Sequence, residues 1–295
     1  MLSFFSFYLI LLSILSSLTT GCTSEPADKQ TAGSQEAGLQ KSGLQKVGQM
    51  PKQVDESSGI ETTDEAGVFL THNDAGGKAA LYKINEQGKL LETLPVPGAK
   101  NVDWEDLTRD SNGHLYIGDF GNNDNKRQNL RIYKVRLQDM GQAEEIRFRY
   151  EDQQAFPPPK EEQNFDCEAF FWHNQKLYLI TKDRGSKSAA NMYEVADQPG
   201  EHVARKVDAF ETTDKITSAA ISPSGQRLAL LSNKKLHLFD LSDSKKPGFF
   251  DGKKTTVSIK ETGQAEGVVF LDNQNLLITD EEGGIYRYGL REEGQ

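Results

Sequence analysis

The chain has 295 residues, of which 36% are hydrophobic, 26% charged and 9% aromatic, and its formal net charge is −10 at pH 7. This acidity argues against nucleic acid or an anionic lipid surface as the main partner, whereas small cations or basic ligands fit it. Only two cysteines are present, and one of them, Cys22, lies where we expect lipid attachment. Cys167 then has no partner within the chain, which excludes a disulfide scaffold.

The N-terminus resembles a lipoprotein signal. Residues 1–20 are apolar and of signal-peptide size, and the ending LTTGC is similar to the motif at which bacterial lipoproteins are cleaved and acylated on the cysteine. The segment has no charged side chain and Thr19 stands where a larger aliphatic residue is usual, so an uncleaved anchor helix is the alternative. We therefore expect a signal peptide over residues 1–22, a lipidated Cys22, and a lipid-anchored protein of the bacterial cell envelope. Its expected place is the outer membrane, facing the periplasm or the cell exterior.

The next segment, residues 23–45, is rich in Ser, Gly, Gln, Ala and Lys and poor in large apolar residues. This composition predicts a flexible tether. We expect a single domain to follow, over residues 46–291.

One plan recurs five times within this domain. Each repeat has a first strand, a turn, a second strand ending in Asp or Asn and a third strand with an apolar, aromatic, polar cadence, and the first four repeats add a less regular fourth strand. The key residues of the five first strands are Ser58, Glu105, Glu168, Ser218 and Glu266. A unit of four strands that repeats about every 40–50 residues is typical of a β-propeller blade.

The sequence therefore predicts an all-β fold, a β-propeller of five blades with about four antiparallel strands each. The count becomes six if the long interval around Pro157–Pro159 hides a degenerate blade, although its composition favours a surface loop. A β-sandwich is the alternative fold. Because the fifth repeat runs out at Tyr288, we expect a strand from Val47 to Val54 to complete the last blade and cover its edge.

In three repeats the key residue and the end of the second strand are both acidic. Residues at equal distances from the turn of an antiparallel hairpin face each other. The predicted pairs are Glu105 with Asp119, Glu168 with Asp183, and Glu266 with Asp280. Since the innermost strands of a propeller line its channel, we expect these side chains to form a ring at one mouth of the channel.

Such a ring is a candidate metal site. Converging carboxylates repel each other unless they are partly protonated or neutralised by a cation, and oxygen ligands suit Ca²⁺. All six acids are candidate ligands, and the segments 72–74 and 122–124 could add more. Two alternatives stay open: the acids cap strands and turns, or they form a catalytic site.

Other chemistry has little support in the sequence. The five histidines lack the spacing of a zinc site, and no nucleophile elbow, phosphate-binding loop or dinucleotide fingerprint is present. Cys167 has no evident base nearby. We expect Trp104 and Trp172 in the core between blades, with stacking on a sugar or peptide as the alternative.

The strings THNDAGG, NVDWEDLTRDSNGHLYIGDFGNN and RIYKV resemble bacterial secreted or lipid-anchored propellers that are related in layout to the SdiA-regulated and phytase-like esterase propeller domains. The resemblance is dense over residues 57–137 and diffuse over 164–290, where it survives mainly as D-x-E and E-G segments. It implies a propeller, and gluconolactonase-like relatives imply a calcium ion in the channel mouth. Glu105, Glu168 and Glu266 lie at comparable positions here, whereas the serines in the other two repeats interrupt the ring.

Two functions fit these observations. The first is a non-enzymatic binding or scaffold lipoprotein that presents the propeller to an unidentified protein or small molecule, with a divalent cation at the channel mouth. The second is a Ca²⁺-dependent hydrolase of esters, lactones or phosphate esters, in which the carboxylates hold the ion as a Lewis acid. We expect a monomer that contacts the membrane through its lipid and does not bind nucleic acid. The sequence assigns no catalytic residue.

Overall fold

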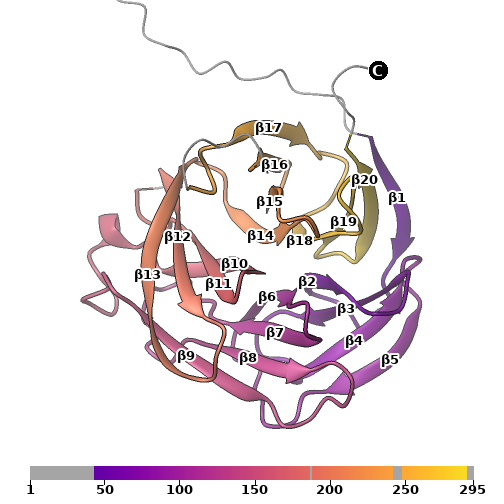
Figure 1. Ribbon diagram of the computed structural model, residues 1–295, viewed down its shortest axis with the longest axis horizontal. Helices are drawn as coiled ribbons and strands as arrows, with labels where there is room; N and C mark the ends of the chain where they lie inside the picture. Colours follow the sequence, from indigo (N-terminus) through magenta and orange to yellow (C-terminus); the bar gives the residue numbers. More distant parts are fainter. Residues whose placement is uncertain (1–42, 187, 242–247, 291–295) are drawn as a thin grey trace, which may run out of the picture. The chain divides into compact units, whose positions relative to one another are not determined.

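The computed structural model describes residues 43–290, except for residue 187 and residues 242–247. Within these ranges the chain forms twenty β-strands and a short 3-10 helix, Lys160–Glu162, with no α-helix (Figure 1). None of the described segments is a helix long and apolar enough to span a membrane. The predicted signal peptide, Cys22 and most of the predicted tether lie outside the described residues.

The strands form five antiparallel meanders of four strands. The first meander contains β2 (Ser57–Thr62), β3 (Val68–Asn73), β4 (Ala80–Asn85) and β5 (Leu90–Pro95), and the second contains β6 (Trp104–Arg109), β7 (His114–Asp119), β8 (Arg131–Arg136) and β9 (Glu144–Tyr150). The third contains β10 (Asp166–His173), β11 (Lys176–Lys182), β12 (Ala189–Ala196) and β13 (Gly200–Glu211). The fourth contains β14 (Ile216–Ile221), β15 (Arg227–Ser232), β16 (Lys235–Asp240) and β17 (Lys253–Ser258). The fifth contains β18 (Ala265–Phe270), β19 (Asn275–Asp280), β20 (Gly284–Gly289) and, from the other end of the chain, β1 (Leu44–Gln49).

The meanders surround a common centre. Their first strands, β2, β6, β10, β14 and β18, contact one another in cyclic order (Figure 1). This arrangement confirms the predicted all-β propeller fold. The second and third meanders share one eight-stranded sheet, because the first part of β13 pairs in parallel with β9. The described strands therefore form four hydrogen-bonded sheets but five meanders. The number of blades stays a prediction, and that prediction is five.

The fifth meander is completed by both ends of the domain. Strand β1 pairs antiparallel with β20, from Leu44 opposite Tyr288 to Gln49 opposite Gly284. A closing strand was predicted, but its predicted bounds, Val47 to Val54, are wrong. Pro51 has no N–H to donate to a ladder, and its carbonyl instead accepts a hydrogen bond from the Val54 N–H in a turn. Met50 and Val54 are instead buried in the core on either side of this turn.

Buried Asp106 joins the innermost strands. Its carboxylate accepts hydrogen bonds from the backbone N–H groups of Leu107 (2.9 Å), Phe170 (3.2 Å) and Ala219 (3.2 Å) and from the Ser218 hydroxyl (3.1 Å). The Ser218 oxygen in turn accepts the N–H of Val268 on β18. Four of the five innermost strands are therefore tied together through one side-chain network beside the acids described next.

Candidate functional site

A β-bulge lies in the first strand of every meander. The pairing with the second strand shifts at Gly59, at Glu105 and Asp106, at Glu168, at Thr217 and at Glu266. A bulge adds one residue to a strand and re-aims its side chain. Three of the predicted acids are therefore bulge residues, while in the first and fourth meanders the bulge falls on Gly59 and Thr217, next to the predicted Ser58 and Ser218.

The bulges overturn the predicted pairing of acids across the hairpins. Asp119 faces Trp104, Asp280 faces Ala265, and Lys182, the neighbour of Asp183, faces Asp166. The extra residue moves the register by one position, and a one-residue shift sends a side chain to the other face of a sheet. The pairs expected from equal distances to the turn are therefore not formed.

The three aspartates hold loops in place. Asp119 accepts the N–H of Asp103 (3.0 Å) and a hydrogen bond from Arg127 (3.0 Å). Asp183 accepts the N–H groups of Gly185 (2.9 Å) and Ser188 (3.1 Å). Asp280 accepts the N–H of Gly263 (2.9 Å) and the hydroxyl of Tyr286 (2.9 Å). None of the three is among the described residues that line the cavity below.

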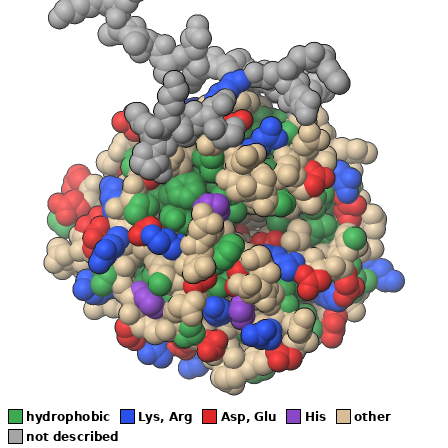
Figure 2. Space-filling model, in the orientation of Figure 1, with side chains coloured by type: hydrophobic (Ala, Val, Ile, Leu, Met, Phe, Trp, Pro, Cys, Tyr) green, Lys and Arg blue, Asp and Glu red, His purple; other side chains and the backbone are tan. Residues whose placement is uncertain are grey.

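Glu105, Glu168 and Glu266, in contrast, meet in one cavity of about 180 Å³. Every described residue that lines it is polar or charged: Glu56, Ser57, Ser58, Asp74, Glu105, Asn123, Glu168, Lys182, Arg184, Gln264, Glu266 and Glu281. They come from the first, second, third and fifth meanders and from the loops that flank their strands. Figure 2 shows one face of the molecule, with acidic side chains visible in the hollow near its centre.

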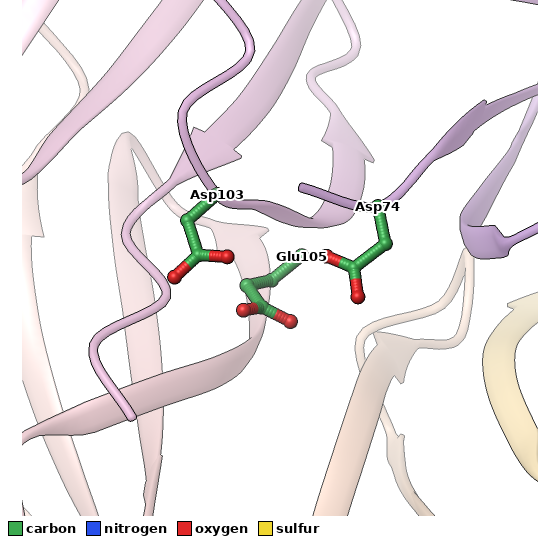
Figure 3. Close-up of side chains that lie close together, drawn as sticks. All are labelled: Asp74, Asp103 and Glu105. Atoms are coloured by element: carbon green, nitrogen blue, oxygen red, sulfur yellow. The ribbon is translucent and has the colours of Figure 1, made fainter. Parts of the chain in front are cut away.

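Asp74 and Glu105, which line this cavity, form a close group with Asp103, and we call these three residues the acidic triad. Each offers a carboxylate oxygen, and these oxygens lie within 4.8 Å of one another (Figure 3). Asp74 follows β3, Asp103 precedes β6, and Glu105 lies in the β6 bulge. The Glu105 side chain is the most enclosed, since the residue is only 7% exposed. No described residue donates a hydrogen bond to its carboxylate, so Glu105 is a buried acid without a partner.

Trp104 and Gly121 explain how two acids can lie so close together. Trp104 is fully buried, packs edge-on against His72 and donates its indole N–H to the Lys100 carbonyl (2.9 Å). Its two acidic neighbours in the chain, Asp103 and Glu105, offer carboxylate oxygens that lie within 4.8 Å of each other. A Cβ atom on Gly121 would lie 2.0 Å from the nearer Glu105 oxygen and 2.5 Å from an Asp103 oxygen. Glycine at this position therefore leaves the space in which both carboxylates fit.

Charge compensation is uneven across the cavity. Glu168 has two cationic partners, Lys182 Nζ at 2.9 Å and an Arg184 guanidinium nitrogen at 2.8 Å. Arg184 also pairs with Asp166. The nearest cation to the triad is Arg127, 3.9 Å from an Asp103 oxygen, and its closer contact is with Asp119. The triad therefore carries negative charge that the described residues do not neutralise.

The carboxyl pKa values reflect this imbalance. Burial, reinforced by Asp74, raises the pKa of Asp103 to about 6, although Arg127 opposes the shift. Burial and then the neighbouring acids, Glu168 first, raise the pKa of Glu105 well above its usual range. Burial and Glu168 raise the pKa of Glu266 to about 8. Bringing a cation into the cavity would relieve these unfavourable ionisations, so the arrangement is suited to holding one.

Sequence reasoning found three of the cavity acids and named Asp74 among possible further ligands, but it missed Asp103 and the basic pair Lys182 and Arg184. A signal for Asp103 was present. Asp103 and Glu105 are two residues apart, and in extended chain such residues share a face. In the sequence, the D-x-E segment Asp103-Trp104-Glu105 supports the resemblance to a family, but its spacing also predicts that the two acids lie together.

The fold and the cavity thus define a β-propeller with an acidic pocket at its innermost strands. The model of the family described as SdiA-regulated matches residues 44–288, and the chain belongs to this family. A search of curated proteins found no match.

Several solved structures are similar to the chain at low sequence identity. A PQQ-bound aldose sugar dehydrogenase from Streptomyces coelicolor has a TM-score of 0.53 and 10% identity, over 84% of this chain and 98% of that one. A gluconolactonase from Xanthomonas campestris has a TM-score of 0.44 and 14% identity, over 76% and 69%. The WD40 repeats of RRP9 give 0.45 and 10%, over 86% and 100%. The first of these likenesses supports the fold, and none of them carries information about chemistry.

Proposed function

We propose that the protein is a lipid-anchored binding module of the cell envelope whose acidic cavity takes up a divalent cation, with Ca²⁺ as the best match. The observation that carries this proposal is the largely buried Glu105, which lines the cavity beside Asp74 and, within 4.8 Å, Asp103, with no cation paired to its carboxylate among the described residues. Ca²⁺ takes about six to eight oxygen ligands from carboxylates, amide carbonyls and water. The triad supplies carboxylates, and the Asn123 amide and the Ser58 hydroxyl line the same cavity.

A cation is favoured over the alternative of shared protons. A shared proton only removes the repulsion between neighbouring carboxylates, whereas a divalent ion is attracted to all three carboxylates at once. A hard ion also fits the absence of nitrogen and sulfur ligands from the triad. The binding role is proposed because an ion held by three carboxylates would keep further coordination positions for a ligand from outside.

The lipid anchor is the second part of the proposal. It is supported by the apolar segment of residues 1–20 and by the LTTGC ending at Cys22. Acylation of this cysteine would hold the propeller at a membrane surface while the tether lets it reach a partner.

Calorimetric titration of Ca²⁺ into the purified full-length protein in detergent, after treatment with a chelator, tests the cation site. We expect one ion per chain, with binding lost in Glu105→Gln and kept in the matched control Glu211→Gln, whose carboxylate is exposed and outside the cavity. Equal binding by both variants would place any ion elsewhere, and no binding by the wild type would remove the cation from the proposal.

A Ca²⁺-dependent hydrolase of esters, lactones or phosphate esters is the second candidate. The observation in its favour is that Lys182 and Arg184 line the same cavity as Asp74 and Glu105 of the triad, where they could stabilise negative charge that develops on a substrate bound to the ion. A panel of these substrates, assayed with and without Ca²⁺, distinguishes the two functions. Turnover that requires Ca²⁺ and is lost in Glu105→Gln supports the hydrolase, and inactivity on the panel favours the binding module.

A further inference from the structure

The acids of the cavity fall into two groups that are neutralised differently. The triad has no close cation of its own, as described above. Glu168 and Glu266, the bulge acids of the third and fifth meanders, share the rest of the cavity with Lys182. The Lys182 ammonium lies 2.9 Å from a Glu168 oxygen, and its side chain is only 11% exposed.

Lys182 lines the cavity together with acids of both groups. Besides its ion-pair partner Glu168, both Glu266 and Asp74 of the triad line the same cavity. A lysine ammonium is a compact point charge with three donors, the protein group most like a small metal cation.

The position of Lys182 in the repeat is unusual. Cys167, the residue before the bulge, pairs with Thr181 on the second strand, and Lys182 is the residue after Thr181. The same register position holds Asn73 in the first meander and Glu281 in the fifth. The repeat therefore does not require a basic residue here. With a polar or acidic side chain at this position, Glu168 and Glu266 would still line the same cavity, and Arg184, the partner of Glu168, would be the remaining cation there.

We propose that Lys182 is a built-in cation that occupies the Glu168–Glu266 half of the cavity and thereby limits the cavity to one divalent ion, held by the triad. This inference rests on the proposed function, since it presumes that the triad binds the ion. Lys182 is then a specificity-determining residue: it sets how many ions bind and where. It also keeps a fixed positive charge beside the ion, which a ligand from outside would meet.

The number of bound ions tests the inference. Calorimetric titration of the full-length protein with Ca²⁺ should give one ion per chain for the wild type and for Lys182→Arg, which keeps the charge. Lys182→Met should give two ions per chain, and Lys182→Met combined with Glu266→Gln should return the number to one. Lys182→Gln is a second neutral variant, and thermal melting shows whether each variant is folded.

The outcomes separate this inference from the proposed function. If the wild type binds no Ca²⁺, the proposed cation site has failed. If the wild type binds one ion and folded Lys182→Met and Lys182→Gln also bind one, the cation site stands and the role of Lys182 is overturned. A second ion that persists in the double variant would likewise overturn the role, because it would lie away from Glu266.

Discussion

Replacing Gly121 with alanine perturbs the site without touching any charge. The new Cβ would lie 2.0 Å from a Glu105 oxygen and 2.5 Å from an Asp103 oxygen, both far shorter than real contacts of this kind. The atoms it meets are the ends of flexible side chains, so both carboxylates can rotate away by about 1 Å or more with little change in the backbone. Gly121 does not have a positive φ, so alanine fits its conformation.

The expected consequence is weaker Ca²⁺ binding with little loss of stability. Disturbing the groups that position metal ligands typically costs about 10–100-fold in affinity, and a tenfold loss corresponds to about 1.4 kcal/mol. Calorimetry should therefore show a dissociation constant at least about tenfold larger for Gly121→Ala. Gly141→Ala is the matched control, because its Cβ would make only an ordinary 3.6 Å contact with Asp139. Wild-type affinity in folded Gly121→Ala would refute the assignment of the site to these two carboxylates.

Three further predictions concern pH, the centre of the propeller and the anchor. Without metal, stability should fall as pH rises from about 4.5 to about 8, because burial raises the pKa of Glu266 to about 8 and that of Asp103 to about 6. Saturating Ca²⁺ should flatten the part of this slope that is due to Asp103, which belongs to the triad. Asp106→Ala should lower the free energy of unfolding by about 3 kcal/mol or more in urea titrations, since four buried donors lose their acceptor, and Asp106→Asn should cost less. Cys22→Ser should move the protein from the membrane to the soluble fraction after cell fractionation.

The sign of the pH effect follows from proton uptake. In the unfolded chain Glu266 releases its proton near its ordinary pKa of 4.5, while in the folded chain it holds the proton to about pH 8. Between these values the folded state binds more protons, so raising the pH favours unfolding. Melting temperatures that rise across this window in the metal-free protein would contradict the raised pKa values. An Asp106→Ala variant as stable as the wild type would show that the central network contributes little, and Cys22→Ser that stays membrane-bound would argue for an uncleaved anchor helix.

The propeller was predictable because each repeat has the same order of strand, turn and aromatic residue. This order does not determine the register in which the first and second strands pair. A bulge is one residue in a strand of about six, and neither Glu168 nor Glu266 looks different from an ordinary strand residue in the sequence. Since a one-residue shift exchanges the two faces of a sheet, the structure brings Glu105, Glu168 and Glu266 together at the cavity, whereas Asp119 and Asp280 do not line it.

The cations of the site were harder to predict for a different reason. Lys182 and Arg184 flank Asp183 at a strand end, where charged residues are ordinarily solvated. Their role depends on Glu168 turning inward at its bulge, and that is a tertiary effect. The closing strand shows the same limit on a smaller scale. Pairing with β20 begins at Leu44 and ends at Gln49, whereas the predicted strand ran from Val47 to Val54.

The most direct test of the cation site is a crystal structure of the protein grown with Ca²⁺, with the ion located by its anomalous scattering. The account predicts one ion bound by Glu105 together with Asp74 and Asp103, with oxygen ligands at about 2.3–2.6 Å, and Lys182 still paired with Glu168. An empty triad at saturating Ca²⁺, or an ion bound at Glu168 and Glu266 in place of Lys182, would contradict it.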